Sequence, residues 1–166
     1  MDPIYVIIET PKGKNVKYDY EPESGFFFLK KVLPAGMVFP YDFGFIPGTK
    51  GKDGDPLDII VISEFTTFPG CKIECRLIGC IRAWQQETKN KNKRTRNDRF
   101  IAIPTHSVIF NTTNSIKDIP AKLIDELKAF FIQYNKMENK IFTVEGLLNA
   151  QKSLKAIQQA QQAMVY

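Results

Sequence analysis

The chain has 166 residues, of which 43% are hydrophobic and 25% are charged, and its net charge is +5 at pH 7. These values are typical of a globular domain large enough for a core, and they exclude a disordered or fibrous chain. No stretch has the length and apolarity of a membrane span, and the N-terminus lacks a basic segment followed by an apolar one. We expect a single domain over residues 1–166 and no membrane partner.

The cysteines are three in number and lack any Cys-x-x-Cys pair: Cys71, Cys75 and Cys80. An odd set without paired spacing favours reduced core residues over a disulfide framework or a thiolate metal site. Together with the absence of a secretory signal, this pattern predicts a cytoplasmic protein.

Short β-branched and aromatic runs, separated by turn signals, fill the first two thirds of the chain. Residues 4–9 predict an opening strand, and residues 16–20 and 26–31 flank a Glu-Pro-Glu-Ser-Gly turn, which predicts a hairpin. Further strands are expected at residues 39–46, 57–63, 72–84 and 99–103. Many short strands at such intervals are typical of a small barrel or sandwich.

Three carboxylates, those of Asp53, Asp55 and Asp58, fall within six residues where a loop enters a buried strand. Gly54 allows a tight turn, and Pro56 disfavours helix at the residue before it. Acids this close repel one another, and a hard cation such as Mg²⁺ with oxygen ligands would relieve the repulsion. A solvated Asp-Gly turn explains the same residues. An EF-hand calcium loop does not, because Asp58 stands where that loop needs glycine.

A run of basic residues precedes the strand at 99–103. Its members are Lys89, Lys91, Lys93, Arg94 and Arg96, with no acid between residues 89 and 96, so this run accounts for the whole net charge. It lies within a basic insertion at about residues 85–98. A solvated loop between two strands explains such a run, and non-specific attraction to nucleic acid or polyphosphate is the alternative. No aromatic residue is interleaved to stack on bases, so we expect no nucleic-acid partner.

Helical periodicity replaces strand patterns near Asp118. This residue can cap a helix that has Pro120 in its first turn. Apolar residues then recur at spacings of four, three and four: Leu123, Leu127, Phe130 and Tyr134. A second helix is expected from about Glu145, with one side formed by Leu147, Ala150, Leu154, Ile157 and Met164. The expected fold is therefore α+β, a small closed OB-like β-barrel with two C-terminal α-helices packed against it.

The acidic loop Asp53-Gly54-Asp55-Pro56-Leu57-Asp58 resembles the signature of the soluble family I inorganic pyrophosphatases. Further segments resemble that family in the same order, over about residues 4–155: Ile8-Glu9-Thr10-Pro11, residues 15–20, residues 40–46, residues 76–79 and Val144-Glu145-Gly146. The resemblance implies Mg²⁺-dependent hydrolysis of inorganic pyrophosphate to two phosphates by metal-activated water. It also implies that pyrophosphate enters as a Mg²⁺ complex and that the chain forms a homo-oligomer, since bacterial members are hexamers.

The same resemblance implies roles for individual residues. Asp55 orients the attacking water and accepts its proton. The metal ligands are Asp53 and Asp58, with Asp58 bridging, and Glu9 holds an outer metal through water. Substrate contacts fall to Lys17, which neutralises a phosphate oxygen, and to Tyr134, which donates a hydrogen bond. The only histidine, His106, receives no role.

Several positions depart from the family pattern, which identifies a divergent member. Lys31 replaces an arginine in the substrate site and so lacks the bidentate fork. In the second acidic segment, counting back from Pro104 places Asn97 at an aspartate and Arg99 at a lysine that binds substrate.

These departures leave the metal set and the activity open. We expect Asp98 to serve as a metal ligand after a short register shift. Glu87 is a more distant substitute, and a reduced number of metal ions is the third reading. The departures also leave open a slower enzyme, or a catalytically degenerate barrel that binds phosphate-rich ligands or a protein partner.

Overall fold

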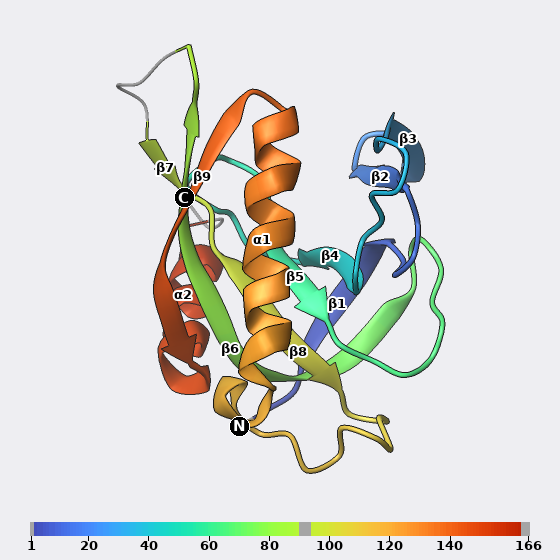
Figure 1. Ribbon diagram of the computed structural model, residues 1–166. Helices are drawn as coiled ribbons and strands as arrows, with labels where there is room; N and C mark the ends of the chain where they lie inside the picture. The colour runs from blue at the N-terminus through green and yellow to red at the C-terminus, as the bar shows by residue number, and fades with distance from the viewer. Residues whose placement is uncertain (1, 90–93, 164–166) are drawn as a thin grey trace.

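The structure is a computed structural model, and it describes residues 2–89 and 94–163 (Figure 1). Its elements follow one another as β1 (Ile4–Thr10), β2 (Val16–Glu21), β3 (Phe26–Val32), β4 (Asp42–Ile46), β5 (Leu57–Val61), β6 (Lys72–Glu87), β7 (Arg94–Arg96), β8 (Arg99–Pro104), the 3-10 helix η1 (Ile116–Asp118), α1 (Ala121–Met137), β9 (Lys140–Asn149) and α2 (Ala150–Gln162).

Five strands pair around a ring. β1 pairs antiparallel with β4 and with the beginning of β6, β4 pairs with β5, β5 runs parallel to β8, and β8 returns to β6. The β1–β4 and β6–β8 ladders each contain a register shift, so the barrel is irregular rather than strictly closed. The expected OB-like barrel with two C-terminal helices is confirmed, and the predicted hairpin exists as the separate β2–β3 sheet.

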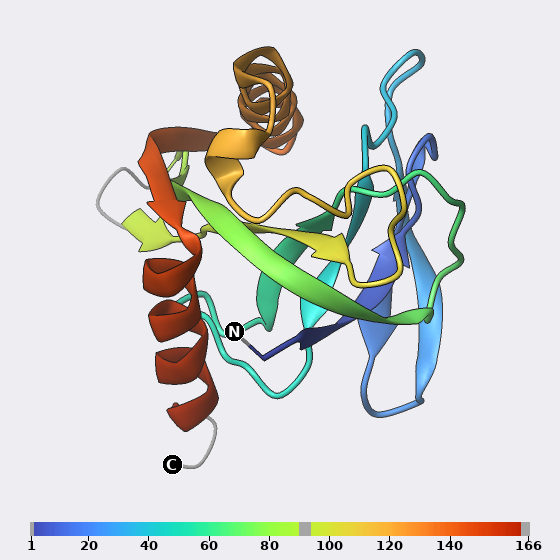
Figure 2. The same cartoon turned by 90° about the horizontal axis from the view of Figure 1, so that it is seen from below.

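The β5 strand explains how the two core clusters are divided. Its residues are apolar at consecutive positions, so the alternation of side chains sends Ile60 to one face and Ile59 and Val61 to the other. Ile60 packs in the cluster that includes Leu127 of α1, whereas Ile59 and Val61 share a cluster with Ile157 of α2. The two helices accordingly lie on different sides of the barrel (Figures 1 and 2).

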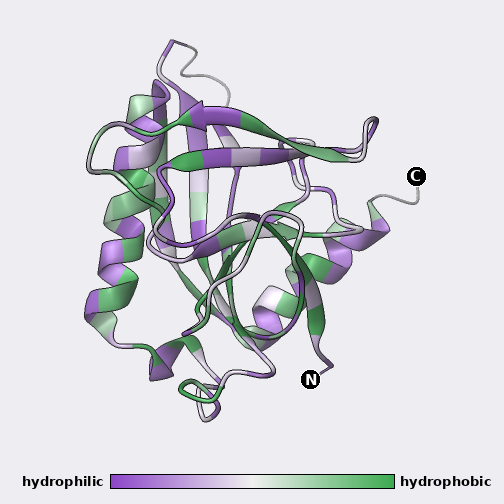
Figure 3. Cartoon of the chain, turned by 90° about the vertical axis from the view of Figure 1, so that its right-hand side faces the viewer, coloured by the Kyte–Doolittle hydropathy of each residue, from purple (hydrophilic) through white to green (hydrophobic). Residues whose placement is uncertain are grey.

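Each helix carries hydrophilic residues beside its hydrophobic ones (Figure 3). In the parts of the chain that the structure describes, none of the helices is long and apolar enough to cross a membrane.

The second helix begins five residues later than the sequence pattern indicates, at Ala150 rather than near Glu145. The preceding segment is the strand β9, which pairs with β6 from Gly79 to Glu87. Long-range strand pairing therefore overrides the local helical periodicity. Asn149 ends the strand and caps α2, since its side-chain oxygen accepts a hydrogen bond from the Lys152 amide. Met164, expected on this helix, lies outside the described residues.

Smaller differences occur elsewhere. β4 begins only at Asp42, and β7 occupies part of the expected insertion. Asp118 lies in the η1 turn, where it forms a capping box with Ser115, and α1 starts after Pro120. Proline fits that position because the first amides of a helix need no intrahelical partner.

Candidate active site

A cavity of about 700 Å³ opens between the acidic loop, the β2–β3 hairpin, the end of β6 and the last turns of α1. Seven of the nine residues predicted for the site line it: Lys17, Lys31, Asp53, Asp55, Asp58, Arg99 and Tyr134. Lys30, Gln85, Glu87, Asn97, Glu138 and Lys140 also line it. Acidic and basic side chains therefore face the same space, as binding a phosphate anion together with cations requires.

The acidic loop is held by short-range hydrogen bonds. Gly54 has a φ of 98°, which lets the chain turn between Asp53 and Asp55, and the Asp55 amide donates to Asp53 Oδ1 at 3.3 Å. Thr49 ties the loop to the barrel, because its hydroxyl accepts from the Leu57 amide and donates to the Ile46 carbonyl. The loop thus presents its carboxylates at the mouth of a rigid strand.

Asp58 forms an ion pair with Arg99 across the β5–β8 ladder. Arg99 Nη1 lies 2.6 Å from Asp58 Oδ2, and the arginine is only 4% exposed. Its guanidinium also lies 5.0–5.9 Å from the ring centroids of Phe43, Phe131 and Phe142. A charge buried among aromatic rings needs its counter-ion, so Asp58 stabilises Arg99.

The carboxylates of the loop are held in an environment that disfavours three negative charges. Burial raises the pKa of Asp58 against the opposing effect of Arg99. Removal from water by the surrounding protein raises the pKa of Asp53, and the negative charge of Asp58 raises it further. A cation would relieve both effects.

The hairpin supplies cations from two adjacent strands. Lys17 and Lys30 both contact the carboxylate of Asp19, and the Lys30 Nζ–Asp19 Oδ2 distance is 2.6 Å. Burial alone would raise the pKa of Asp19, but the hydrogen bonds from the two lysines outweigh burial and lower it. Three charges held together in this way are positioned for an anion in the cavity.

Lys31 and Tyr134 form a second pair at the end of α1. Lys31 Nζ lies 4.2 Å from the centroid of the Tyr134 ring and 2.8 Å from Glu138 Oε1. Burial lowers the pKa of Lys31 and raises that of Tyr134, so the tyrosine stays a neutral hydrogen-bond donor at neutral pH.

Glu9 lies beside the cavity but does not line it. Its carboxylate is buried and accepts a hydrogen bond from the Tyr20 amide at 3.1 Å. Burial raises the pKa of Glu9 to about 7, although the charge of Lys17 opposes this.

The raised pKa of Glu9 predicts a pH-dependent stability. The folded chain retains a proton that the unfolded chain releases above about pH 4.5, so the contribution of Glu9 to stability is lost as the pH rises to about 7. With metals removed by EDTA, the free energy of unfolding relative to Glu9→Gln should fall over this range by up to ~3 kcal/mol. Urea titrations at several pH values measure it, and parallel pH profiles for the two proteins would contradict the assignment.

The wall opposite the acidic loop carries amides. Asn97 Nδ2 donates to Gln85 Oε1 at 2.9 Å, and Asn97 Oδ1 accepts from Arg99 Nη1. Both amides line the cavity. Gln85 was not among the predicted residues, because its side chain reaches this wall only through the pairing of β6 with β7, where Gln85 stands opposite Thr95.

Asp98 is directed away from this wall. Its Oδ1 accepts from the Ala83 amide at 2.9 Å and lies 3.5 Å from Arg96 Nη1, and the side chain lines a neighbouring cavity instead. This placement does not support the expectation that Asp98 joins the metal ligands. Glu87 does line the site, 3.8 Å from Lys140 Nζ.

The two arginines in the described part of the basic insertion face away from this cavity. Arg94 and Arg96 form β7 and contact Glu145, with Arg96 Nη1 at 2.8 Å from Glu145 Oε2. Lys91 and Lys93 lie outside the described residues.

The site has a donor set that suits Mg²⁺ without forming a finished cage. Over residues 2–89 and 94–163, no three His, Cys, Asp or Glu side chains converge as a ready-made metal centre. Mg²⁺ commonly binds through one or two carboxylates, with water and substrate phosphate completing its ligands. Asp53 in the loop and Asp58 at the start of β5, both with raised pKa values, meet that requirement.

An OB-like barrel with an acidic loop facing lysines and an arginine defines a class of phosphate-handling protein. The family model described as "Inorganic pyrophosphatase" matches residues 6–165. The chain is 35% identical over 154 residues to "Inorganic pyrophosphatase" from Halalkalibacterium halodurans, which covers 93% of this chain and 90% of that protein. It is 36% identical over 148 residues to the Saccharolobus solfataricus protein of the same name, and the match covers 87% of this chain and 82% of that protein.

Solved structures agree with the sequence comparisons. The inorganic pyrophosphatase of Helicobacter pylori superposes with a TM-score of 0.87 at 30% identity, over 98% of this chain and 93% of that one. The inorganic pyrophosphatase of Thermus thermophilus superposes with a TM-score of 0.87 at 28% identity, over 98% of this chain and 91% of that one. The chain therefore belongs to the family I soluble inorganic pyrophosphatases, and the resemblance read from its motifs is confirmed.

Proposed function

We propose that this protein hydrolyses inorganic pyrophosphate to two phosphates in a Mg²⁺-dependent reaction. The observation that carries the proposal is the single cavity in which Asp53, Asp55 and Asp58 face the cations of the hairpin and Arg99. Family membership supports the reaction class. Pyrophosphate is a compact, highly charged anion, and its hydrolysis depends on positioning and on neutralising charge.

Asp53 and Asp58 are the proposed metal ligands, with Glu9 acting on an outer ion through water. When bound, the metal ions supply Lewis-acid activation of water and neutralisation of phosphate charge. Asp58 would then exchange its contact with Arg99 for one with a cation, and this frees the guanidinium for substrate. The amides Gln85 and Asn97 add no negative charge to the opposite wall, and the acid that lines the cavity there is Glu87 rather than Asp98. This favours either Glu87 or a smaller number of metal ions over a ligand from Asp98.

Asp55 is the proposed general base. It is exposed to the cavity, between the two proposed metal ligands, and its carboxylate can orient a water molecule and accept its proton. Lys17, Lys31 and Arg99 hold phosphate oxygens, and Tyr134 donates a hydrogen bond to the phosphate that stays behind. No protein nucleophile takes part.

Phosphate release from pyrophosphate tests the function. We expect turnover by the native chain with Mg²⁺, loss of turnover with EDTA, and recovery when Mg²⁺ is restored in excess. Failure with Mg²⁺, Mn²⁺ and Zn²⁺ alike, while pyrophosphate still binds, would instead establish a degenerate barrel that only binds phosphate-rich ligands.

We further propose a homo-oligomer in the cytoplasm. Three free cysteines support the reducing compartment, and exposed apolar side chains on β3 support an interface. Phe26, Leu29 and Val32 are 72%, 56% and 61% exposed.

The β3 residues give a test of assembly. Phe26→Ser combined with Leu29→Ser should lower the sedimentation coefficient toward that of a monomer, because an interface loses apolar area. The control is Val108→Ser, which changes a similarly exposed apolar residue in the loop that follows β8. A native chain that sediments as a monomer at all concentrations contradicts the oligomer.

A further inference from the structure

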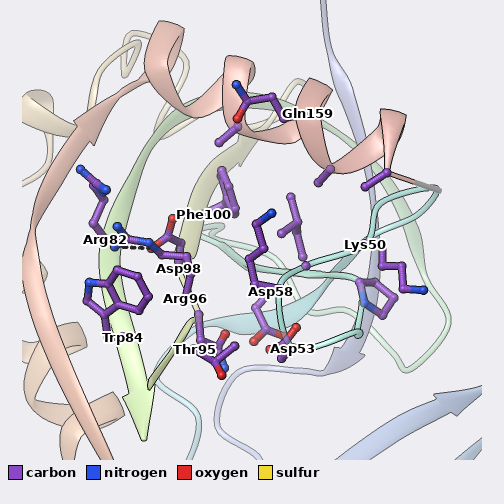
Figure 4. Close-up of a pocket in the computed structure, with 18 of the residues that line it drawn as sticks. Lys50, Asp53, Asp58, Arg82, Trp84, Thr95, Arg96, Asp98, Phe100 and Gln159 are labelled. Atoms are coloured by element: carbon purple, nitrogen blue, oxygen red, sulfur yellow. Dashed lines mark ion pairs between the residues drawn. The ribbon is translucent and has the colours of Figure 1, made fainter. Parts of the chain in front are cut away.

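A second cavity, of about 690 Å³, adjoins the first on the other side of the acidic loop (Figure 4). The two cavities share Lys52, Asp53, Asp58, Thr95 and Asn97, and strand alternation divides the residues around this shared wall. On the segment leading into β8, Arg96, Asp98 and Phe100 line only the second cavity, whereas Arg99 lines only the first. The reaction proposed above uses none of the residues that are confined to the second cavity.

One end of this cavity is basic and aromatic. Figure 4 shows Arg82, Trp84 and Arg96 gathered there, with Lys50 at the opposite end. The guanidinium carbons of Arg96 and Arg94 lie 4.1 Å and 4.8 Å from the centroid of the Trp84 ring. These cation–π contacts hold two guanidinium groups close together, and guanidinium groups can contact phosphate in a bidentate manner.

A single surface carboxylate balances these arginines. Glu145 Oε2 lies 2.8 Å from Arg96 Nη1 and 3.7 Å from Arg82 Nη2, and Glu145 Oε1 lies 3.9 Å from Arg94 Nη2. Three guanidinium groups thus share one exposed acid, with Asp98 as a second partner for Arg96. A multiply charged phosphate could replace Glu145 and satisfy the cluster better than one carboxylate does.

The rest of the wall is apolar. Leu57 and Phe100 come from the barrel, Leu148 comes from β9, and Ala156 and Ala160 come from α2. An apolar wall next to a cationic cluster matches a ligand with a flat ring at one end and phosphates at the other.

We propose that this second cavity binds a nucleotide, with its phosphates on Arg82, Arg94 and Arg96 and its base against the apolar wall formed by Phe100, Leu148 and α2. Pyrophosphate alone would meet the arginines but leave the apolar wall uncovered. The cavity volume lies within the usual range for sites that enclose small organic ligands.

Trp84 allows a direct test, because it is the only tryptophan of the chain. We expect ADP, added to the native full-length protein, to change the tryptophan fluorescence with a saturable curve. Adenosine and pyrophosphate should each give a much weaker change at the same concentrations. Saturating pyrophosphate should not displace ADP, and Asp55→Asn should not alter its affinity, which separates this site from the active site whatever the outcome for hydrolysis.

Substitutions of the arginines and of Glu145 should change ADP affinity in opposite directions. Arg82→Ala and Arg96→Ala should each weaken ADP binding about tenfold or more, since each removes charge-assisted hydrogen bonds. Glu145→Gln should strengthen it several-fold, because it removes the competing charge. Lys152→Ala, on the exposed face of α2, is the control and should have no effect.

The Glu145→Gln result is the decisive one, because a merely structural role for this cluster predicts no gain in affinity. Absence of a saturable change with ADP in both the native protein and Glu145→Gln would overturn the proposal. So would displacement of ADP by pyrophosphate at active-site concentrations.

Discussion

Replacement of Asp55 by asparagine is expected to lower kcat for pyrophosphate by about 10²–10⁴-fold, the usual contribution of a general base. Asparagine keeps the size and shape of the side chain and can still orient water, but it cannot accept the proton. KM should change little, since the cations of the cavity stay in place. Steady-state phosphate release at saturating Mg²⁺ measures both parameters.

The control for Asp55→Asn is Asp125→Asn, which removes an equally exposed carboxylate from the surface of α1. It should retain the native kcat. Because Asp55 is exposed, its replacement should also leave the urea midpoint unchanged, so a loss of activity is not a loss of folding. If Asp55→Asn keeps more than a tenth of the native kcat, the general base is a group other than Asp55.

Removal of Asp58 is expected to destabilise the protein far more than removal of its partner Arg99. The Arg99 side chain is 5% exposed and that of Asp58 is 25% exposed, so only the aspartate can be hydrated when the pair is broken. Asp58→Ala leaves the Arg99 cation among three phenylalanine rings with only neutral oxygens of Asn97 and Asp98 as partners, and it should cost ~3–5 kcal/mol. Arg99→Met fills the same aromatic surroundings with an apolar chain and should cost only about 1–2 kcal/mol.

The double variant provides the control for this asymmetry. In Asp58→Ala with Arg99→Met no charge is stranded, so the double variant should be more stable than Asp58→Ala alone. Urea unfolding in EDTA measures the four proteins, and hydrolysis should be lost in all three variants. Equal costs for the two single variants would mean that Arg99 reaches water when its partner is gone.

Local chemistry in the sequence was sufficient for much of the site. The acidic loop was predicted because Gly54 and Pro56 impose a turn on neighbouring carboxylates, and such a signal needs no distant contact. The β2–β3 hairpin was equally local, and its bounds shifted by one residue at most. Leu123, Leu127 and Phe130 likewise predicted α1, because helical periodicity is a property of consecutive residues.

The errors arose where distant segments decide the structure. Leu147 stands at a helical spacing from Ala150 and Leu154, yet residues 145–149 form the end of β9 because β6 offers them a ladder of hydrogen bonds. The role of Asp98 as a metal ligand stays a prediction, but its side chain contacts the Ala83 amide and Arg96 and does not line the site. A shift of one residue in a strand moves a side chain to the opposite face, and that register is set by the partner strand.

The sequence by itself therefore determined the family, the barrel with its two helices, and the acidic loop, because each could be recognised from short motifs and local patterns along the chain. Only the tertiary structure decided that Arg99 is the counter-ion of Asp58, that Gln85 and Asn97 form the opposite wall, and that Arg96 faces a second cavity. These contacts depend on the register of strands far apart in sequence. A local pattern carries no information about that register until the barrel has closed.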